Sequence, residues 1–142
     1  VVSLQAHTGL YVEQVGMDIR AMASTREGSK SGFRIHKHDG GVLYHGDKVW
    51  IETPTGKVLE EEGRMIWSRF TRAACSHMPW LATKQEFAIE NERGGGTIRE
   101  SAYVSFKADS GNYLEVESMD VAARFPKKGE WSLFAIGSLG TR

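Results

Sequence analysis

Cysteine is nearly absent from this chain, and its absence sets the first limits on the protein. Cys75 is the only cysteine among 142 residues, so no disulfide can form within the chain. A reducing, cytoplasmic location is therefore expected. Proline is also scarce, with three residues against sixteen glycines. This composition favours many tight turns over an extended or disordered linker.

The chain also lacks an excess of either charge. Its 18 lysines and arginines balance its 18 aspartates and glutamates. A nucleic-acid partner or an electrostatically bound membrane surface is therefore not expected. No apolar run is long enough for a membrane-spanning helix, no signal-peptide pattern is visible, and membrane insertion is not expected. No motif indicates a cofactor.

An internal repeat is the strongest positive feature of the sequence. The segment that begins at Val2 returns without a gap from Val104, and a fainter copy begins at Val49. In each copy, apolar and polar residues alternate, as in a strand with one buried face. The repeat predicts one domain, 1–142, built from three units that span approximately 1–47, 48–102 and 103–142.

Each unit predicts four short strands and few helices. The first two strands are separated by a glycine, Gly9, Gly56 or Gly111, which indicates a hairpin turn with a positive φ. Each unit closes with a Phe-x-Ile phrase that starts at Phe33, Phe87 or Phe134 and is expected to anchor the core. Twelve strands in three units predict an all-β fold, a β-trefoil with a six-stranded barrel capped by three hairpins.

The repeat also suggests a family. Its best copy, Val104–Glu117 with Trp131–Ile136, resembles the repeat of fascin-type β-trefoils. A single trefoil of this length is also similar to the β-trefoil lectins of mushrooms such as the king bolete. The resemblance implies a non-catalytic, fungal, carbohydrate-binding protein with several sites, and glycans ending in galactose or N-acetylgalactosamine as partners. It also implies a homo-oligomer as a possible state. The ricin-type Gln-x-Trp signature is absent.

The segments that follow the closing phrases have the character of sugar-binding loops. Their polar side chains and glycine amides can hydrogen-bond to hydroxyl groups, and their glycines let a ligand approach the backbone. The candidate carbohydrate-binding residues are His38, Asp39, Gly40, Gly41, Asn91, Arg93, Gly94, Gly95, Ser138 and Gly140. The alternative for the same residues is a solvated turn between units.

Other interpretations stay open beside the lectin. A fascin-like module that binds actin, or a protease inhibitor whose inhibitory loop spans 70–82, would use the same fold. The three histidines His36, His38 and His45 favour a metal site only weakly, and Cys75 with His77 favours a thiol nucleophile only weakly. Glu60 recurs in the other units as Glu13 and Glu115 and is expected to be architectural, and Trp80 is expected to be exposed.

Overall fold

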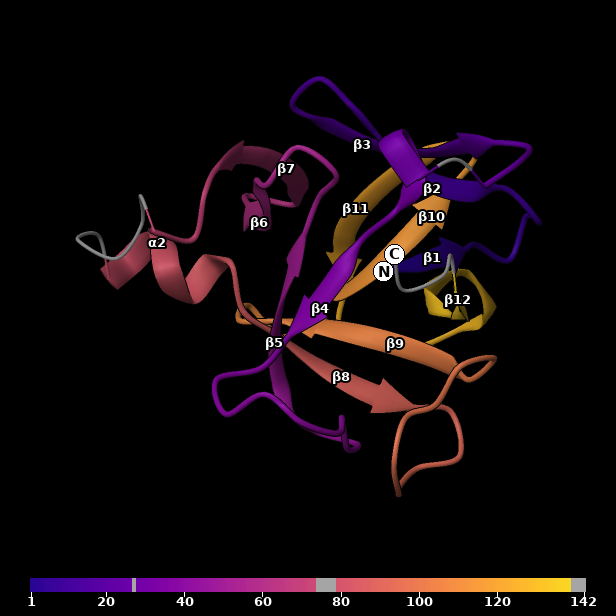
Figure 1. The fold of residues 1–142 in the computed structure, drawn as a ribbon, viewed down its shortest axis with the longest axis vertical. Coiled ribbons are helices and arrows are strands. Elements are labelled where there is room, and N and C mark those ends of the chain that lie inside the picture. The colour runs from indigo at the N-terminus through magenta and orange to yellow at the C-terminus, as the bar shows by residue number, and fades with distance from the viewer. Residues whose placement is uncertain (27, 74–78, 139–142) are drawn as a thin grey trace.

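A computed structural model describes residues 1–26, 28–73 and 79–138 of the chain. The described part is almost entirely antiparallel sheet (Figure 1). Its strands are β1 (Val2–Gln5), β2 (Tyr11–Val15), β3 (Asp18–Ala23), β4 (Arg34–His36), β5 (Lys48–Glu52), β6 (Val58–Glu62), β7 (Met65–Phe70), β8 (Phe87–Asn91), β9 (Tyr103–Ala108), β10 (Tyr113–Glu117), β11 (Asp120–Phe125) and β12 (Phe134–Ser138). The helices are short: α1 (Gly28–Ser31), α2 (Pro79–Lys84) and a 3₁₀ turn at Glu130–Ser132.

The all-β prediction and the strand count are confirmed, but the arrangement corrects the predicted β-trefoil. Ten strands form one closed ring in the order β11-β3-β2-β1-β12-β9-β8-β5-β6-β7, which closes through the pairing of β11 with β7. β10 bridges β11 and β9, and β4 pairs with β5. The prediction treated the hairpins as separate caps on a six-stranded barrel. In the structure they are hydrogen-bonded continuations of a single sheet.

The reason lies in the third strand of each repeated unit. β3, β7 and β11 pair with one another, through Asp120 with Arg20, Ala122 with Met65, and Asp18 with Trp67. These contacts carry the sheet across the end of the barrel. A strand whose edge is paired in this way exposes no unsatisfied backbone groups. The alternation of residues within one strand specifies its two faces and leaves its neighbours undetermined, so the sequence pattern did not reveal these pairings.

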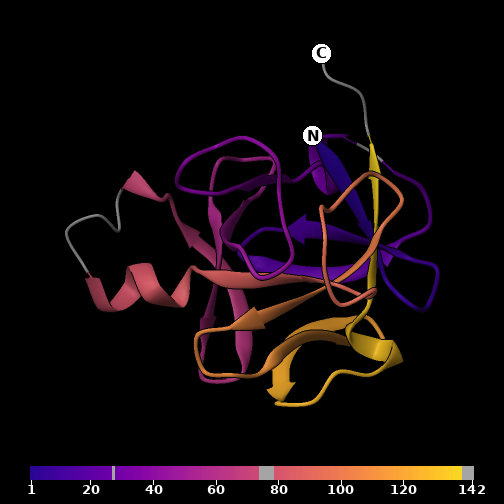
Figure 2. The same ribbon diagram turned by 90° about the horizontal axis from the view of Figure 1, so that it is seen from below.

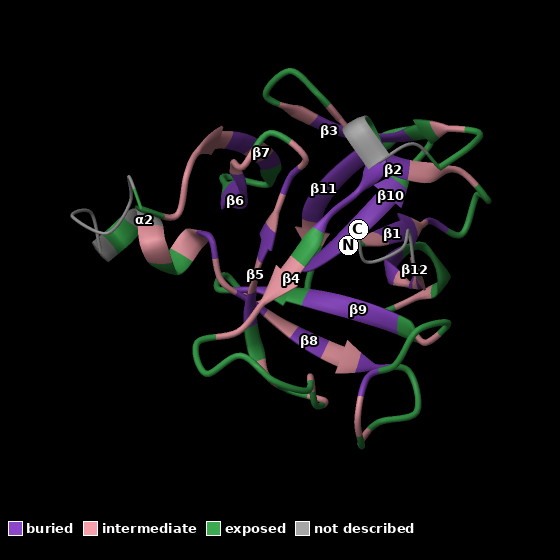
Figure 3. Cartoon of the chain, viewed as in Figure 1, coloured by how far each residue is buried: buried purple, intermediate pink, exposed green. Residues whose placement is uncertain are grey.

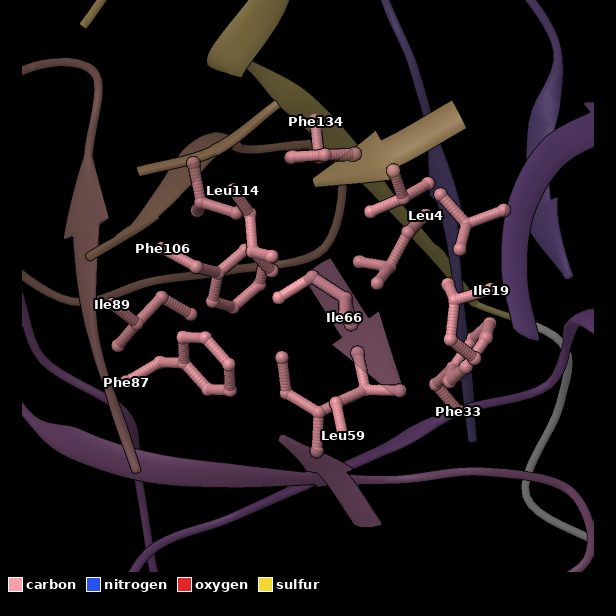
Figure 4. Packing of buried hydrophobic residues seen from close by; sticks show 14 of the residues in the cluster. Leu4, Ile19, Phe33, Leu59, Ile66, Phe87, Ile89, Phe106, Leu114 and Phe134 are labelled. Atoms are coloured by element: carbon pink, nitrogen blue, oxygen red, sulfur yellow. The ribbon is translucent and has the colours of Figure 1, made fainter. Parts of the chain in front are cut away.

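The core fills the inside of the barrel. The four most deeply buried aromatic side chains are Phe33, Phe87, Phe106 and Phe134, and Figure 4 shows them pointing inward together with Leu4, Ile66 and Leu59. The prediction that the Phe-x-Ile phrases anchor the core is confirmed for all three phenylalanines. Figure 3 shows the same division, with buried strands and exposed loops.

The glycine turns are confirmed as well. Gly9, Gly56 and Gly111 have φ values of 88°, 87° and 94°, in the left-handed region that favours glycine. In each case the glycine amide donates to the carbonyl three residues earlier. The turns fix the register of the hairpins and therefore the face on which each strand residue lies.

The described part of the 70–82 segment beyond β7 lies outside the barrel. Helix α2 projects from the side of the barrel, as Figures 1 and 2 show, and contacts β6. Trp80 on this helix is 65% exposed, as expected. Cys75 and His77 lie outside the described residues, as does part of the 70–82 segment that an inhibitor would use. Among the described residues, no helix has the length and apolar character needed to cross a membrane.

Candidate functional site

The most concentrated set of binding features on the described surface surrounds Tyr103, the first residue of β9. Its side chain is 53% exposed. Tyr103 is the Cα partner of Ala135 on β12, Ala135 is the partner of Gln5 on β1, and Gln5 is the partner of Tyr11 on β2. Directly paired residues lie on the same face of an antiparallel sheet. The four residues therefore form a row across four strands, about 14 Å from Tyr103 to Tyr11 at three inter-strand steps.

Three cavities meet at Tyr103. The Arg93 cavity, about 290 Å³, lies between Tyr103, Arg93 and Arg99. The Glu130 cavity, about 380 Å³, is lined by Tyr103, Gln5, His7, Glu92 and Glu130. The Tyr11 cavity, about 270 Å³, is lined by Tyr103, Tyr11, Gln5, Arg26, Ser101 and Gly137. We call the joined area the Tyr103 surface.

The chemistry of this surface suits a hydroxyl-rich ligand. An exposed tyrosine ring offers an apolar face, while glutamate, glutamine and arginine side chains offer acceptors and donors around it. Gln5 is already oriented, because its Nε2 donates to the carbonyl of Gly9 at 2.9 Å. His7 is oriented too, with its Nε2 3.0 Å from the carbonyl oxygen of Val116. Side chains that are held before binding lose less entropy when the ligand arrives.

Another cavity, about 430 Å³, lies beside the Tyr103 surface and shares Arg99 and Glu100 with the Arg93 cavity. Its walls are mainly aliphatic and aromatic, with Phe33, Ile35 and Leu43 among them. Sugar recognition depends on several directed polar groups as well as an apolar face. The Tyr103 surface provides more of them, so volume alone does not identify the site.

The structure places the predicted residues of the first loop away from Tyr103. His38 is exposed, with its Nε2 3.1 Å from Glu86 Oε2 and its ring edge against Trp50. Asp39, Gly40 and Gly41 follow it in an exposed turn. None of these four residues lines the three cavities that meet at Tyr103.

Asp47 stabilises the end of the same loop. Its carboxylate accepts the Tyr44 amide at 2.8 Å and lies 3.2 Å from Lys37 Nζ. The hydrogen bond from the Tyr44 amide, followed by the Lys37 contact, holds the pKa of Asp47 below its ordinary value in spite of partial desolvation. The loop therefore has its own internal order, which is consistent with either a turn or a binding loop.

Asn91 organises the second loop from within. Its side chain is buried, its Nδ2 donates to the carbonyls of Gly95 and Thr97, and its Oδ1 accepts the Arg93 amide. Its backbone amide donates to His45 Nδ1 at 2.9 Å. The side-chain amide of Asn91 is therefore already hydrogen-bonded within the loop. Asn91 therefore positions the Arg93 loop, and Asn91 and Arg93 both line the Arg93 cavity.

Of the remaining predicted residues, Gly94 and Gly95 do not line the three cavities that meet at Tyr103. Gly94 and Gly95 lie in the turn that Asn91 holds, and Gly94 has a φ of 82°. Ser138 ends β12, and Gly140 lies outside the described residues. Trp131 is 47% exposed and does not belong to the core.

Metal binding finds no support in the described part of the chain, where no three metal-binding side chains come together. His36 lies 2.8 Å from Glu52 and stacks on Trp50, while His45 accepts the Asn91 amide. Of the three glutamates expected to be architectural, Glu60 and Glu115 are buried and each is paired with an arginine, whereas Glu13 is only partly buried.

Sequence reasoning missed Tyr103, Tyr11 and Gln5. One signal could have found Tyr103: Val104, Phe106 and Ala108 are the apolar positions of β9 expected to be buried, so Tyr103 alternates to the outside. An aromatic residue on the outer face of a barrel strand is informative when polar residues surround it. Which residues surround it depends on strand pairing, which the repeat does not specify.

The network around His38 gives a testable prediction on stability. Glu86 accepts bonds from His38 and from Arg72 Nη2 at 2.8 Å, and Arg72 lies 4.7 Å from the Trp50 ring. Burial alone raises the pKa of the Glu86 carboxyl, but the hydrogen bonds and charges of His38 and Arg72 outweigh it and the pKa lies below its ordinary value. The network joins the loop after β4 to the segment that carries α2.

Glu86→Gln is expected to lower the free energy of unfolding at pH 7 by about 1 kcal/mol, since the charged acceptor is lost from a partly exposed site. Because the pKa of Glu86 in the folded protein lies below its ordinary value of 4.5, the charged carboxylate stabilises the fold at pH values above 4.5. This stabilisation is lost as the pH falls through the folded-state pKa. The variant should therefore lose less stability than the wild type between pH 6 and about pH 3. Urea unfolding at each pH measures this, with the exposed Glu100→Gln as control. A steeper acid loss in Glu86→Gln would contradict it.

Comparisons with known proteins address the fold. No protein-family model matches the sequence, and no curated protein sequence matches it. Among solved structures, an SDF2-like protein from Arabidopsis thaliana superposes with a TM-score of 0.79 at 12% identity, over 96% of this chain and 91% of that chain. A Caenorhabditis elegans protein of unknown function superposes with a TM-score of 0.77 at 13% identity, over 96% and 92%.

A third match lies within a larger assembly. The protein O-mannosyltransferase Pmt1–Pmt2 complex of S. cerevisiae, determined with its sugar donor bound, gives a TM-score of 0.73 at 9% identity, over 96% of this chain and 24% of that chain. At these identities the likeness is one of fold. It corrects the resemblance to mushroom lectins and to fascin, and with it the expectation of a fungal lectin specific for galactose or N-acetylgalactosamine. The repeat residues that suggested those families are mostly core and turn residues, which record how the chain packs and carry no ligand specificity.

Proposed function

We propose that this chain is a non-catalytic carbohydrate-binding domain that binds glycans at the Tyr103 surface. The observation that carries the proposal is the half-exposed Tyr103 ring at the junction of three cavities of about 270 to 380 Å³. Glu92, Gln5 and Arg93 lie around the ring and supply acceptors and donors for hydroxyl groups. The fold likeness to part of a mannosyltransferase complex solved with its sugar donor is compatible with this function.

The mode of binding follows from the geometry. A sugar ring would place its C–H face on Tyr103 and direct its hydroxyl groups to the side chains on either side. The Arg93 and Glu130 cavities flank Tyr103 and share Glu92. A ligand of two or more sugar units would therefore occupy more of the surface than a single sugar.

Tyr103→Ala is expected to reduce glycan affinity at least about tenfold, because the ring is the central apolar contact. The measurement is binding of labelled wild-type and variant protein to a broad glycan array, followed by titration calorimetry on the best ligand. Tyr44→Ala is a matched control, since Tyr44 is 50% exposed and lies on the His38 loop. The result that contradicts the proposal is no glycan binding by folded protein, or a loss of affinity in Tyr44→Ala and none in Tyr103→Ala.

A further inference from the structure

Two junctions between repeated units share one design, the first where β8, β9 and β10 meet and the second where β12, β1 and β2 meet. At the first junction, Tyr113 Oη donates to both carboxylate oxygens of Glu90, at 3.0 and 3.2 Å. Lys128 Nζ lies 3.0 Å from Glu90 Oε1 and 5.9 Å from the Tyr113 ring centre. Tyr113 is only 7% exposed. A tyrosine hydroxyl and a cation thus enclose one carboxylate.

The first junction keeps that carboxylate ionised. Burial raises the pKa of Glu90, but the hydrogen bonds from Lys128 and Tyr113 outweigh it and the pKa lies below its ordinary value. Burial, together with the Glu90 acceptor, raises the pKa of the Tyr113 hydroxyl. The tyrosine therefore remains a donor and the glutamate an acceptor throughout the neutral range.

The second junction repeats this arrangement where β12 meets β1 and β2. Gly137 pairs with Ser3 as Glu90 pairs with Ser105, and Tyr11 pairs with Gln5 as Tyr113 pairs with Lys107. Arg26 follows the end of β3 by three residues, as Lys128 follows the end of β11. Tyrosine and cation are thus both present at corresponding positions, as Tyr11 and Arg26.

Among the residues that the structure describes, no carboxylate lines the Tyr11 cavity at the second junction. Gly137 stands in β12 where Glu90 stands in β8, the fourth residue of each five-residue strand. In place of a glutamate side chain there is the Tyr11 cavity of about 270 Å³. A Cβ on Gly137 would lie 2.7 Å from Ser3 Oγ and 3.1 Å from Arg26 Nη1, so the guanidinium is beside the position that a carboxylate-bearing side chain would enter.

We propose that the Tyr11 cavity binds the carboxylate of an acidic sugar, a uronic acid or a sialic acid, in the position that Glu90 occupies at the first junction. The Tyr11 hydroxyl donates a hydrogen bond to the carboxylate, and the Arg26 guanidinium provides the opposite charge. The inference rests on the proposed function, since it names the class of sugar that the Tyr103 surface selects.

A sugar suits the cavity better than an acidic peptide because of its other walls. Tyr103, with its exposed ring, and the polar Gln5 and Ser101 line the same cavity. A sugar ring attached to the carboxylate would therefore meet an aromatic face and hydroxyl partners at once. The Arg93 and Glu130 cavities continue from Tyr103 and extend the contact to neighbouring units of a glycan.

The test compares ligands that differ only in the carboxylate. The probes are a hyaluronan tetrasaccharide with its carboxyl-reduced form, and 3′-sialyllactose with lactose, titrated against the whole chain. At least one carboxylated member is expected to bind about tenfold or more tightly than its neutral partner, as for a hydrogen bond to a charged group. Tyr11→Phe is expected to lose about tenfold on that member and nothing on the neutral one. Arg26→Ala is expected to lower the affinity for the carboxylated ligand on the order of tenfold. Arg26→Lys is expected to retain binding, since a lysine, Lys128, pairs with the Glu90 carboxylate at the first junction.

Gly137→Glu is the most direct variant. It supplies an internal carboxylate, as Glu90 does, and is expected to abolish the preference for the carboxylated ligand while the melting temperature stays near that of the wild type. The Ser3 hydroxyl has to rotate, and if the variant does not fold, Tyr11→Phe carries the test alone.

Three results would overturn the inference. Equal binding of both members of each pair, with dependence on Tyr103, removes the acidic-sugar class and leaves the proposed function standing. Binding to poly-glutamate in preference to every glycan assigns the cavity to acidic peptides. No binding to any glycan on an array or by titration removes the proposed function as well.

Discussion

Phe106→Ala is expected to lower the free energy of unfolding by about 3–5 kcal/mol, the range for a buried phenylalanine replaced by alanine. Phe106 is fully buried and lies 6.0 Å from Phe134, ring centre to ring centre, inside the barrel (Figure 4). Its removal leaves a cavity between strands of different units, where the closed sheet has little freedom to collapse. Small domains have total stabilities of about 5–15 kcal/mol, so this one change removes a large part of the total.

Urea unfolding followed by tryptophan fluorescence measures this effect. The matched control is Phe125→Ala, because Phe125 is 48% exposed at the end of β11. It is expected to change the free energy of unfolding by less than about 1 kcal/mol. Comparable losses in the two variants would show that the barrel interior is not the main source of stability.

Arg69→Ala is expected to destabilise the protein by about 3 kcal/mol. Arg69 Nη2 lies 2.9 Å from Oε2 of Glu60, whose side chain is 0% exposed, and Arg69 also pairs with Glu62. Without the arginine, the Glu60 carboxylate is buried in the sheet without its counter-charge, which is the costly way to break a buried pair. The same pairing recurs between Glu115 and Arg124 in the third unit.

The double variant Glu60→Gln with Arg69→Ala separates charge from packing. It is expected to be more stable than Arg69→Ala alone, since a neutral amide is less costly to bury than an unpaired carboxylate. Arg20→Ala serves as the surface control: Arg20 and Asp120 pair at 3.2 Å with side chains 42% and 61% exposed, and such pairs contribute about 1 kcal/mol or less. A double variant that is no more stable than Arg69→Ala would assign the loss to packing of the arginine stem.

Many recurring positions of the repeat have a structural role in this protein. Positions that recur in the units, such as Phe87, Phe134 and Glu60, hold the barrel together. The candidate site combines a recurring position, Tyr11, with positions where the units differ. Gly137 in place of a glutamate opens a cavity, and Tyr103 supplies an exposed ring at its rim. Differences between copies of one unit are therefore the informative places in a repeated fold of this kind.

The structure places the two loops that the sequence favoured differently relative to Tyr103. Arg93 lines one of the cavities that meet at Tyr103, and Asn91 holds the loop that carries it. His38 pairs with Glu86 and packs on Trp50 instead of lining those cavities. A polar, glycine-rich segment is typical of binding loops and of ordinary turns alike, and the two differ only in what other strands bring beside them.

The sequence by itself determined the all-β class, the repeated unit, the positive-φ glycine turns and the buried phenylalanines, because alternation and turn chemistry act within a few residues of the chain. The tertiary structure decided how the strands close and which outward residues meet. The pairing of β3, β7 and β11 joins the hairpins into a closed ring of ten strands and corrects the trefoil expectation. Tyr11, Gln5 and Tyr103 become neighbours only because β12 pairs with both β1 and β9. These pairings join residues that are 30 (Phe134 with Val104) to 136 (Val2 with Ser138) positions apart, and no local pattern specifies them.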